Sequence, residues 1–204
     1  MSAAFVALFE VLALPAPWQD DESRPNSLLI VGGGSNCGKF AVQFAKLAKV
    51  QNIVVVGGDE PLLRKFGATH VIDRHLTEDI VISKIREATG DDLVYAVDAV
   101  NMPDGLGLAL NALSRQRRGK MARLLPVGEV DDTRGHEVLD VLGLFLYRKP
   151  ICVAMWERLT EYVAAGAIRP TSFEVLEGLE AEVANAALDG YRDRTNRNKP
   201  QVRL

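Results

Sequence analysis

Four glycines stand close together where an apolar run gives way to a helical pattern. The stretch reads Val31-Gly32-Gly33-Gly34-Ser35-Asn36-Cys37-Gly38. A bound pyrophosphate needs backbone N–H groups directed at it and no Cβ atoms in the way, and a helix N-terminus supplies such amides with a partial positive charge. Gly32 would permit the tight turn, and Gly33 and Gly34 would allow close approach of the phosphates. Gly38 would let the helix pack close to the strand, so the stretch predicts a dinucleotide-binding turn.

The spacing of these glycines departs from the G-x-G-x-x-G pattern. Counting from Gly32 and Gly34, Cys37 takes the place of the third glycine and Gly38 follows one residue later. A purely structural tight turn could use the same residues. The cluster follows a strand-like run and opens a helix, and this context favours nucleotide binding over the structural alternative.

A second glycine pair ends the next strand-like run, in Val56-Gly57-Gly58-Asp59-Glu60. An acidic residue at this place binds the ribose 2′-hydroxyl in NAD-binding proteins. The two glycines leave room for the 2′-phosphate of NADP, whereas Asp59 and Glu60 would repel it. Either acid could instead cap the following helix, with Pro61 in its first turn. The choice between NADP and NAD therefore stays open.

Apolar strand-like runs alternate with helical patterns along most of the chain. The strand-like runs cover residues 28–31, 53–56, 70–72, 93–97 and 122–127, and the helices cover 38–49, 61–66, 78–88 and 106–113. The strands are continuous apolar runs, which is typical of a parallel sheet covered by helices on both faces. This pattern predicts an α/β fold, a Rossmann-type doubly wound parallel sheet with flanking helices. In the helix after the turn, Lys39, Gln43, Lys46 and Lys49 are predicted to form one polar face.

We expect three segments in the chain. Residues 1–27 form an N-terminal helix, buried and amphipathic over 1–14, and a linker. Residues 28–150 form the dinucleotide-binding Rossmann domain, in which the basic stretch 115–123 is a loop leading into a strand and 138–146 is one more strand. Residues 151–204 form C-terminal helices and strands, with helices near 151–165 and 181–188, a strand near 171–176, and a last strand through Val202.

Composition and the scarce metal-binding residues exclude several classes of function. A formal net charge of -3 over 204 residues gives no basic surface for nucleic acid. The apolar segment 1–14 is shorter than the roughly 20 residues of a transmembrane helix, so no membrane partner is expected. Cys37 and Cys152 lie far apart and are expected to be free thiols in a reducing, cytoplasmic environment. His70, His75 and His136 have no metal-binding spacing, so no metal site is expected.

With these motifs in place, the chain resembles the medium-chain dehydrogenase/reductase superfamily, which includes zinc-binding alcohol dehydrogenases, and above all its quinone-reductase and fungal enoyl-reductase branch. The resemblance is carried by residues 31–46, 66–73, 97–100, 125–128 and 166–170, and by the ending through Val202. It extends over nearly the whole chain.

The resemblance implies roles for particular residues. It implies that Ser35, Asn36 and Cys37 line the pyrophosphate and that Gly57, Gly58 and Asp59 lie near the adenosine ribose. It further implies that Val100, Asn101, Val127 and Gly128 lie along the nicotinamide half of NADP or NAD. Each of these last four could instead serve only to pack the ends of strands.

The resemblance also implies an activity and a missing part. Members of the superfamily begin with a GroES-like domain that carries much of the substrate cleft, whereas this chain matches only the cofactor-binding half. An incomplete gene, an isolated domain and a natural short form would each explain this. Cofactor binding is expected to survive, but whether the chain is an enzyme stays open, and no catalytic residue is assigned.

Three hypotheses for function follow. The first is an NAD(P)-binding oxidoreductase domain, NADPH-dependent, that transfers hydride to a small-molecule enone, quinone or enoyl substrate. The second is a non-catalytic dinucleotide-binding module, or a truncated pseudoenzyme, that pairs with a partner. A methyltransferase is the weakest, because residues 99–103 resemble the dehydrogenase pattern. Dimers are common in the superfamily, so a homodimer is one expected assembly, and 138–146 could be its edge strand.

Overall fold

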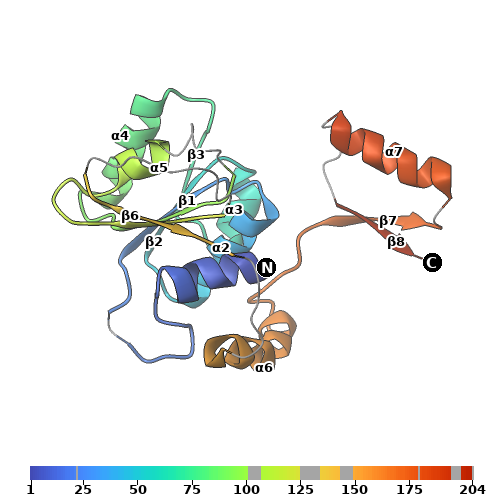
Figure 1. Cartoon of the computed structure of the whole chain (residues 1–204), viewed down its shortest axis with the longest axis horizontal. Helices are drawn as coiled ribbons and strands as arrows, with labels where there is room; N and C mark the ends of the chain where they lie inside the picture. Colours follow the sequence, from blue (N-terminus) through green and yellow to red (C-terminus); the bar gives the residue numbers. More distant parts are fainter. Residues whose placement is uncertain are drawn as a thin grey trace. The chain divides into compact units, whose positions relative to one another are not determined.

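Two compact units make up the chain, Met1–Ile168 and Arg169–Leu204. The computed structural model shown in Figure 1 describes residues 1–21, 23–100, 107–124, 134–142, 149–178, 180–193 and 199–203. Asn101, Val127 and Gly128 lie outside these ranges. Each unit is described by itself below.

The first unit is built on a six-stranded sheet. Its strands are β1 Ser27–Val31, β2 Asn52–Val56, β3 His70–Ile72, β4 Tyr95–Asp98, β5 Lys120–Arg123 and β6 Glu137–Asp140. They lie in the order β3-β2-β1-β4-β5-β6, and every neighbouring pair is parallel. After β3, at one edge of the sheet, the chain crosses back to form β4 on the other side of β1. This is the strand order of a Rossmann fold.

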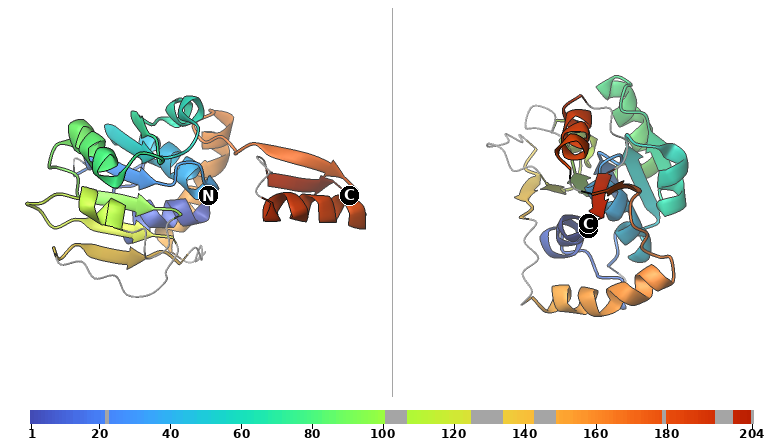
Figure 2. Two further views of the ribbon diagram at one scale, coloured as in Figure 1. Left: turned by 90° about the horizontal axis from the view of Figure 1, so that it is seen from above. Right: turned by 90° about the vertical axis from the view of Figure 1, so that its right-hand side faces the viewer.

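Helices cover both faces of this sheet (Figures 1 and 2). They are α1 Ser2–Phe5, which continues into the π-helical η1 Val6–Val11, then α2 Asn36–Leu47, α3 Glu60–Phe66, α4 Glu78–Thr89, α5 Gly107–Ala112 and α6 Pro150–Ala164. Within β1, Leu28 and Ile30 join a core with α1, η1, α2, α3 and α6. Leu29 and Val31 point the other way, into a core with α4 and α5. Because both faces are buried, β1 is apolar throughout, and the predicted doubly wound α/β fold is confirmed.

The N-terminal helix is part of the first core. Phe5 is fully buried, and its ring lies 4.9 Å from that of Phe9 and 5.6 Å from that of Phe44 in α2. The prediction of a buried amphipathic helix near 1–14 is therefore confirmed. No helix in the described part of the chain is both long and apolar enough to span a membrane.

The predicted polar face of α2 is wrong at two positions. Gln43 is only 2% exposed, and its Nε2 donates to the carbonyl of Lys39 at 3.3 Å. A long amide that meets its hydrogen bond within its own helix can be buried at low cost, and sequence periodicity does not reveal this. Lys49 lies beyond the helix, which ends at Leu47, and has a φ of 60°.

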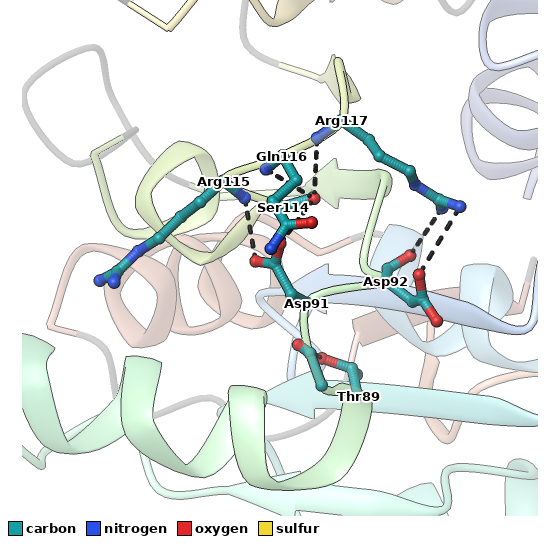
Figure 3. Close-up of polar contacts among 8 residues, drawn as sticks. Thr89, Asp91, Asp92, Ser114, Arg115, Gln116 and Arg117 are labelled. Atoms are coloured by element: carbon teal, nitrogen blue, oxygen red, sulfur yellow. Dashed lines mark hydrogen bonds and ion pairs between the residues drawn. The ribbon is translucent and has the colours of Figure 1, made fainter.

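The basic stretch after α5 is a loop leading into β5, as predicted (Figure 3). Asp91 accepts the N–H of Arg115 at 2.9 Å and the hydroxyl of Ser114 at 3.2 Å. These hydrogen bonds lower the pKa of Asp91, chiefly through the Arg115 N–H. The strand itself is shorter than predicted and ends at Arg123, which is buried and paired with Asp140 in β6. The remainder of the predicted 138–146 strand beyond residue 142 lies outside the described residues.

The second unit contains a small parallel sheet and one helix. Strand β7 is Phe173–Glu177, α7 is Ala181–Arg192 and β8 is Lys199–Arg203. The two strands pair in parallel, with Phe173 opposite Lys199 and Glu177 opposite Arg203. The helix runs one turn further than predicted, to Arg192, where the guanidinium pairs with Asp189 at 2.8 Å.

Candidate functional site

The glycine turn joins the carboxyl end of β1 to the start of α2. The N–H of Gly32 donates to the carbonyl of Val56 at 2.9 Å, so the turn is held to the end of β2. Ser35 is the N-cap of α2, and its hydroxyl accepts the N–H of Gly38 at 2.9 Å. The same hydroxyl donates to the carbonyl of Gly32 at 2.9 Å. The Ser35 side chain thus closes the turn and begins the helix.

Glycine is required at the two ends of this turn. Gly32 has a φ of 89°, which L-residues rarely adopt. A Cβ on Gly38 would lie less than 3.0 Å from the carbonyl oxygen of Gly32, so only glycine lets the helix begin so close to the strand.

The middle of the turn has two different glycines. A Cβ on Gly33 would lie 2.6 Å from the carbonyl oxygen of Gly57, inside the protein. A Cβ on Gly34 would have no neighbour closer than 3.4 Å, the distance to the Cα of Gly58. Packing therefore accounts for glycine at position 33, whereas it leaves position 34 free for close approach of a ligand.

Backbone amides at the start of α2 are free to bind an anion. Among the described residues, no acceptor takes the N–H of Gly34, Asn36 or Cys37. The first N–H groups of a helix have no partner within the helix, and they carry its partial positive charge. The turn therefore offers the amide cradle that a pyrophosphate needs.

A groove of about 760 Å³ runs from this turn across the ends of β2 and β3. Six of the predicted site residues line it: Gly32, Gly34, Ser35, Gly57, Gly58 and Val100. Five others, Gly33, Asn36, Cys37, Gly38 and Asp59, belong to the same loops without lining the groove. The remaining three, Asn101, Val127 and Gly128, lie outside the described residues, and contact of any of these residues with a cofactor stays a prediction.

Sequence reasoning missed a group of groove residues that follow β3: Asp73, Arg74 and His75. The register brings them here, because Val56 in β2 pairs with Ile72 in β3 and parallel strands end at the same edge. The N–H of His75 donates to Asp73 at 2.9 Å, which holds this short loop in shape. The sequence does show where the third apolar run ends. Only the strand order shows that this end lies beside the end of the second run.

Arg74 lies directly over the glycines that end β2. A Cβ on Gly57 would lie 3.3 Å from the Cδ of Arg74 and 3.4 Å from its Cβ, so the aliphatic part of the arginine covers this glycine. Its Nε donates to the imidazole of His75 at 3.4 Å. Arg74 is the one lysine or arginine among the described residues that line the groove.

The two acids after β2 are bound within the protein. Asp59 is the N-cap of α3 and accepts the N–H of Leu62 at 2.8 Å. Glu60 accepts from the Nε of Arg64 at 2.7 Å, one helical turn further along. Asp59 therefore caps the next helix, as one of the alternatives predicted, and its contact with a ribose stays a prediction.

The apolar wall of the groove near the turn is Val100. Its side chain lies over Gly32 and is 42% exposed. Its N–H donates to the carboxylate of Asp98 at 3.1 Å, and Asp98 is 1% exposed at the end of β4.

Cysteine and metal chemistry have little support near the groove. Cys37 and Cys152 are both free, as predicted. Burial, followed by the charge of Glu10, raises the pKa of the Cys152 thiol, which keeps it in the unreactive neutral form. In the part of the chain that the structure describes, no three histidine, cysteine or acidic side chains lie so that they could hold a metal ion.

Comparison with known proteins agrees with this geometry. Residues 37–130 match the family model described as zinc-binding dehydrogenase. The dehydrogenase orsE of Emericella nidulans is 34% identical over 120 residues, which cover 56% of this chain and 34% of that protein. A zinc-type alcohol dehydrogenase-like protein of Schizosaccharomyces pombe is 25% identical over 203 residues, covering 87% of this chain and 56% of that protein.

The chain is thus similar to proteins of the medium-chain dehydrogenase/reductase superfamily, and the family-model match covers just under half of it. This confirms the resemblance described above. The trans-enoyl reductase buaC of Petromyces alliaceus is 28% identical over 114 residues, and the match covers 55% of this chain and 31% of that protein. The chain thus matches about a third of the length of the reductases it is similar to.

Solved structures share the fold of this chain. An alcohol dehydrogenase zinc-binding domain protein from Burkholderia ambifaria superposes with a TM-score of 0.73 at 23% identity, covering 100% of this chain and 53% of that one. The mycobacterial protein Rv1454c, solved in complex with NADPH, superposes with a TM-score of 0.71 at 16% identity and covers 99% of this chain and 62% of that one.

Proposed function

We propose that this chain binds NADP(H) in the groove and acts as the coenzyme half of a reductase for enone, quinone or enoyl substrates. The observation that carries the proposal is the position of Arg74 over Gly57, at the end of the second strand. In Rossmann folds this is where the ribose 2′ position is recognised, by an acid for NAD or by a nearby arginine for NADP. Here the arginine lines the groove, Asp59 caps α3, and Glu60, which also lines the groove, is paired with Arg64.

The described residues fit such a cofactor at both its phosphate positions. The unpaired amides of Gly34, Asn36 and Cys37 would bind the pyrophosphate, and the Arg74 guanidinium would bind the 2′-phosphate. Val100 would place an apolar side chain beside the turn, toward the nicotinamide half. When bound, the nicotinamide supplies the hydride that reduces the acceptor.

The proteins that this chain is similar to support the choice of substrate class. Several of them are named trans-enoyl reductases, and Rv1454c was solved with NADPH. The assignment of substrate rests on these names and on the resemblance, because no catalytic residue is identified in this chain.

A second candidate is a non-catalytic dinucleotide-binding module that pairs with a partner protein. Large apolar side chains on both strands of the second unit favour it, with Phe173 49%, Val175 40% and Val202 43% exposed. Phe173 and Val175 share one face of the small sheet because side chains alternate along a strand, and exposed apolar neighbours of this kind are typical of an interaction surface.

Turnover separates the two candidates. Oxidation of NADPH would be followed at saturating cofactor with a panel of enones, quinones and enoyl thioesters. The reductase proposal predicts substrate-dependent oxidation well above the rate without substrate. Tight binding of NADPH with no oxidation by any member of the panel would contradict it and favour the non-catalytic module.

A further inference from the structure

A second hollow, of about 460 Å³, lies between α4 and α5 and shares no lining residue with the groove. Three arginines line it, Arg86 from α4, Arg115 from the loop after α5, and Arg134 from the segment before β6. Its volume is in the range of small-molecule binding sites, which is roughly 300–1,000 Å³. The proposed cofactor function uses none of these residues.

Part of this arginine cluster has a structural task. The Nη2 of Arg86 donates to the carbonyl of Asn111 at 3.0 Å. The Nη2 of Arg134 donates to the carbonyl of Leu110, and at 3.2 Å to the Oδ1 of Asn111. These carbonyls belong to the last turn of α5, where arginine side chains are common partners. Capping of α5 therefore explains one nitrogen on each of two arginines.

The capping of α5 does not account for two other donor groups of the cluster, the Nε of Arg86 and the guanidinium of Arg115. The Nε of Arg86 is buried and has no hydrogen-bond partner among the described residues. Leaving a buried donor without an acceptor is costly, and most buried polar groups in proteins avoid it. Arg86 therefore lines the hollow with one buried N–H that lacks an acceptor.

Arg115 brings a whole guanidinium to the same hollow. Its backbone N–H is used by Asp91, but within the described part of the chain its side chain makes no hydrogen bond or ion pair. Figure 3 shows the guanidinium extending away from Asp91 and Asp92, whereas the neighbouring Arg117 turns toward Asp92. Arg115 therefore contributes positive charge without an internal partner.

Positive and negative side chains both line this hollow. Burial, and then the nearby charges of Arg115 and Arg134, lower the pKa of Arg86, while Asp91 acts in the opposite direction. Two carboxylates, Glu78 and Asp79, also line the hollow, but Glu78 accepts from the Nδ2 of Asn111 at 3.0 Å. Among the described residues, three guanidinium groups and two carboxylates thus line the hollow, and Asp91 lies near Arg86 as a further negative charge.

We infer that this hollow binds a phosphate-type oxyanion, either free or as the phosphoryl group of a small molecule. Arg86 and Arg115 would donate to the oxyanion, and Arg134 would add its charge beside them. Arginine is suited to this task because its planar fork of N–H donors matches the oxygens of a phosphate. A bound oxyanion would also offset the mutual repulsion of the three arginines.

The test is a calorimetric titration of the full chain with inorganic phosphate and with phenyl phosphate, at constant ionic strength. The glycine turn is itself expected to attract phosphates, so the titrations are made in the Gly34→Val variant. Arg115→Gln is the test variant, because its side chain has no structural contact to lose. Arg117→Gln is the matched control, since it removes the same charge two residues away from a guanidinium paired with Asp92.

We expect Arg115→Gln to weaken binding of the tighter phosphate by about tenfold, and Arg117→Gln by less than about twofold. Tighter binding of phenyl phosphate would identify a phosphorylated small molecule, and tighter binding of inorganic phosphate would identify the free ion. Equal losses in the two variants would indicate general electrostatic attraction and overturn the proposal. Absence of binding to the chain with Arg115 intact would also overturn it.

Discussion

The carboxylates of Asp59 and Glu60 have partners within α3, and this changes what the groove can recognise. One caps the helix and the other pairs with Arg64, so neither needs a ribose hydroxyl. The arginine that lines the groove at the end of β2 is Arg74, packed against Gly57. At the scale of single residues, the proposed preference for NADP over NAD therefore depends on one guanidinium.

Replacing Arg74 should remove that discrimination. We expect Arg74→Gln to weaken NADPH binding by about tenfold, because a charge-assisted contact with the 2′-phosphate is lost, and to leave NADH binding within about twofold. Calorimetry on both nucleotides measures this. Lys84→Gln, an exposed change of equal charge on α4 outside the groove, serves as the control. Parallel losses for NADPH and NADH would assign Arg74 a structural role instead.

At the scale of elements, the groove forms because three parallel strands end together. Val31 pairs with Val56, and Val56 pairs with Ile72, so the residues that follow these strands meet at one edge of the sheet. Ligands of open α/β sheets bind at the carboxyl ends of the strands for this reason. The position of the site is thus a consequence of strand order and register.

The cap of α3 gives a prediction at this scale. Asp59→Ala should lower the free energy of unfolding by about 1 kcal/mol, because the N–H of Leu62 loses its acceptor, and Asp59→Asn should lower it much less. Chemical denaturation of the three proteins measures the difference. The ratio of NADPH to NADH affinity should stay the same in both variants. A changed ratio would mean that the Asp59 carboxylate acts on the ribose and not only on its helix.

The sequence was sufficient to predict the elements because the strands are buried on both faces and stand out as apolar runs. It was also sufficient for the glycine turn, where Gly32 and Gly38 are demanded by backbone geometry. It could not place Arg74, since that requires knowing that β3 lies beside β2. Nor could it decide the role of Asp59, because a helix cap and a ribose ligand call for the same side chain. The buried Gln43 donates a hydrogen bond to the carbonyl of Lys39, which periodicity does not reveal.

At the scale of the whole molecule, binding and turnover have different requirements. All described residues that line the groove lie within the unit Met1–Ile168, so this unit contains what the proposed cofactor contacts need. Hydride transfer also needs a positioned acceptor. The chain spans 53% and 62% of the two solved structures compared above, which leaves the substrate contacts of a complete reductase as a separate question.

The central claim is that the groove beside the glycine turn binds NADP(H) in preference to NAD(H). The most direct measurement is a calorimetric titration of the chain with NADPH and with NADH, repeated on Gly34→Val, whose new side chain would enter the space left for the pyrophosphate. We predict that NADPH binds at least about tenfold tighter than NADH, and that Gly34→Val loses binding while its thermal unfolding midpoint stays close to that of the unchanged chain. Equal affinity for the two nucleotides, or undiminished binding by a folded Gly34→Val variant, would contradict it.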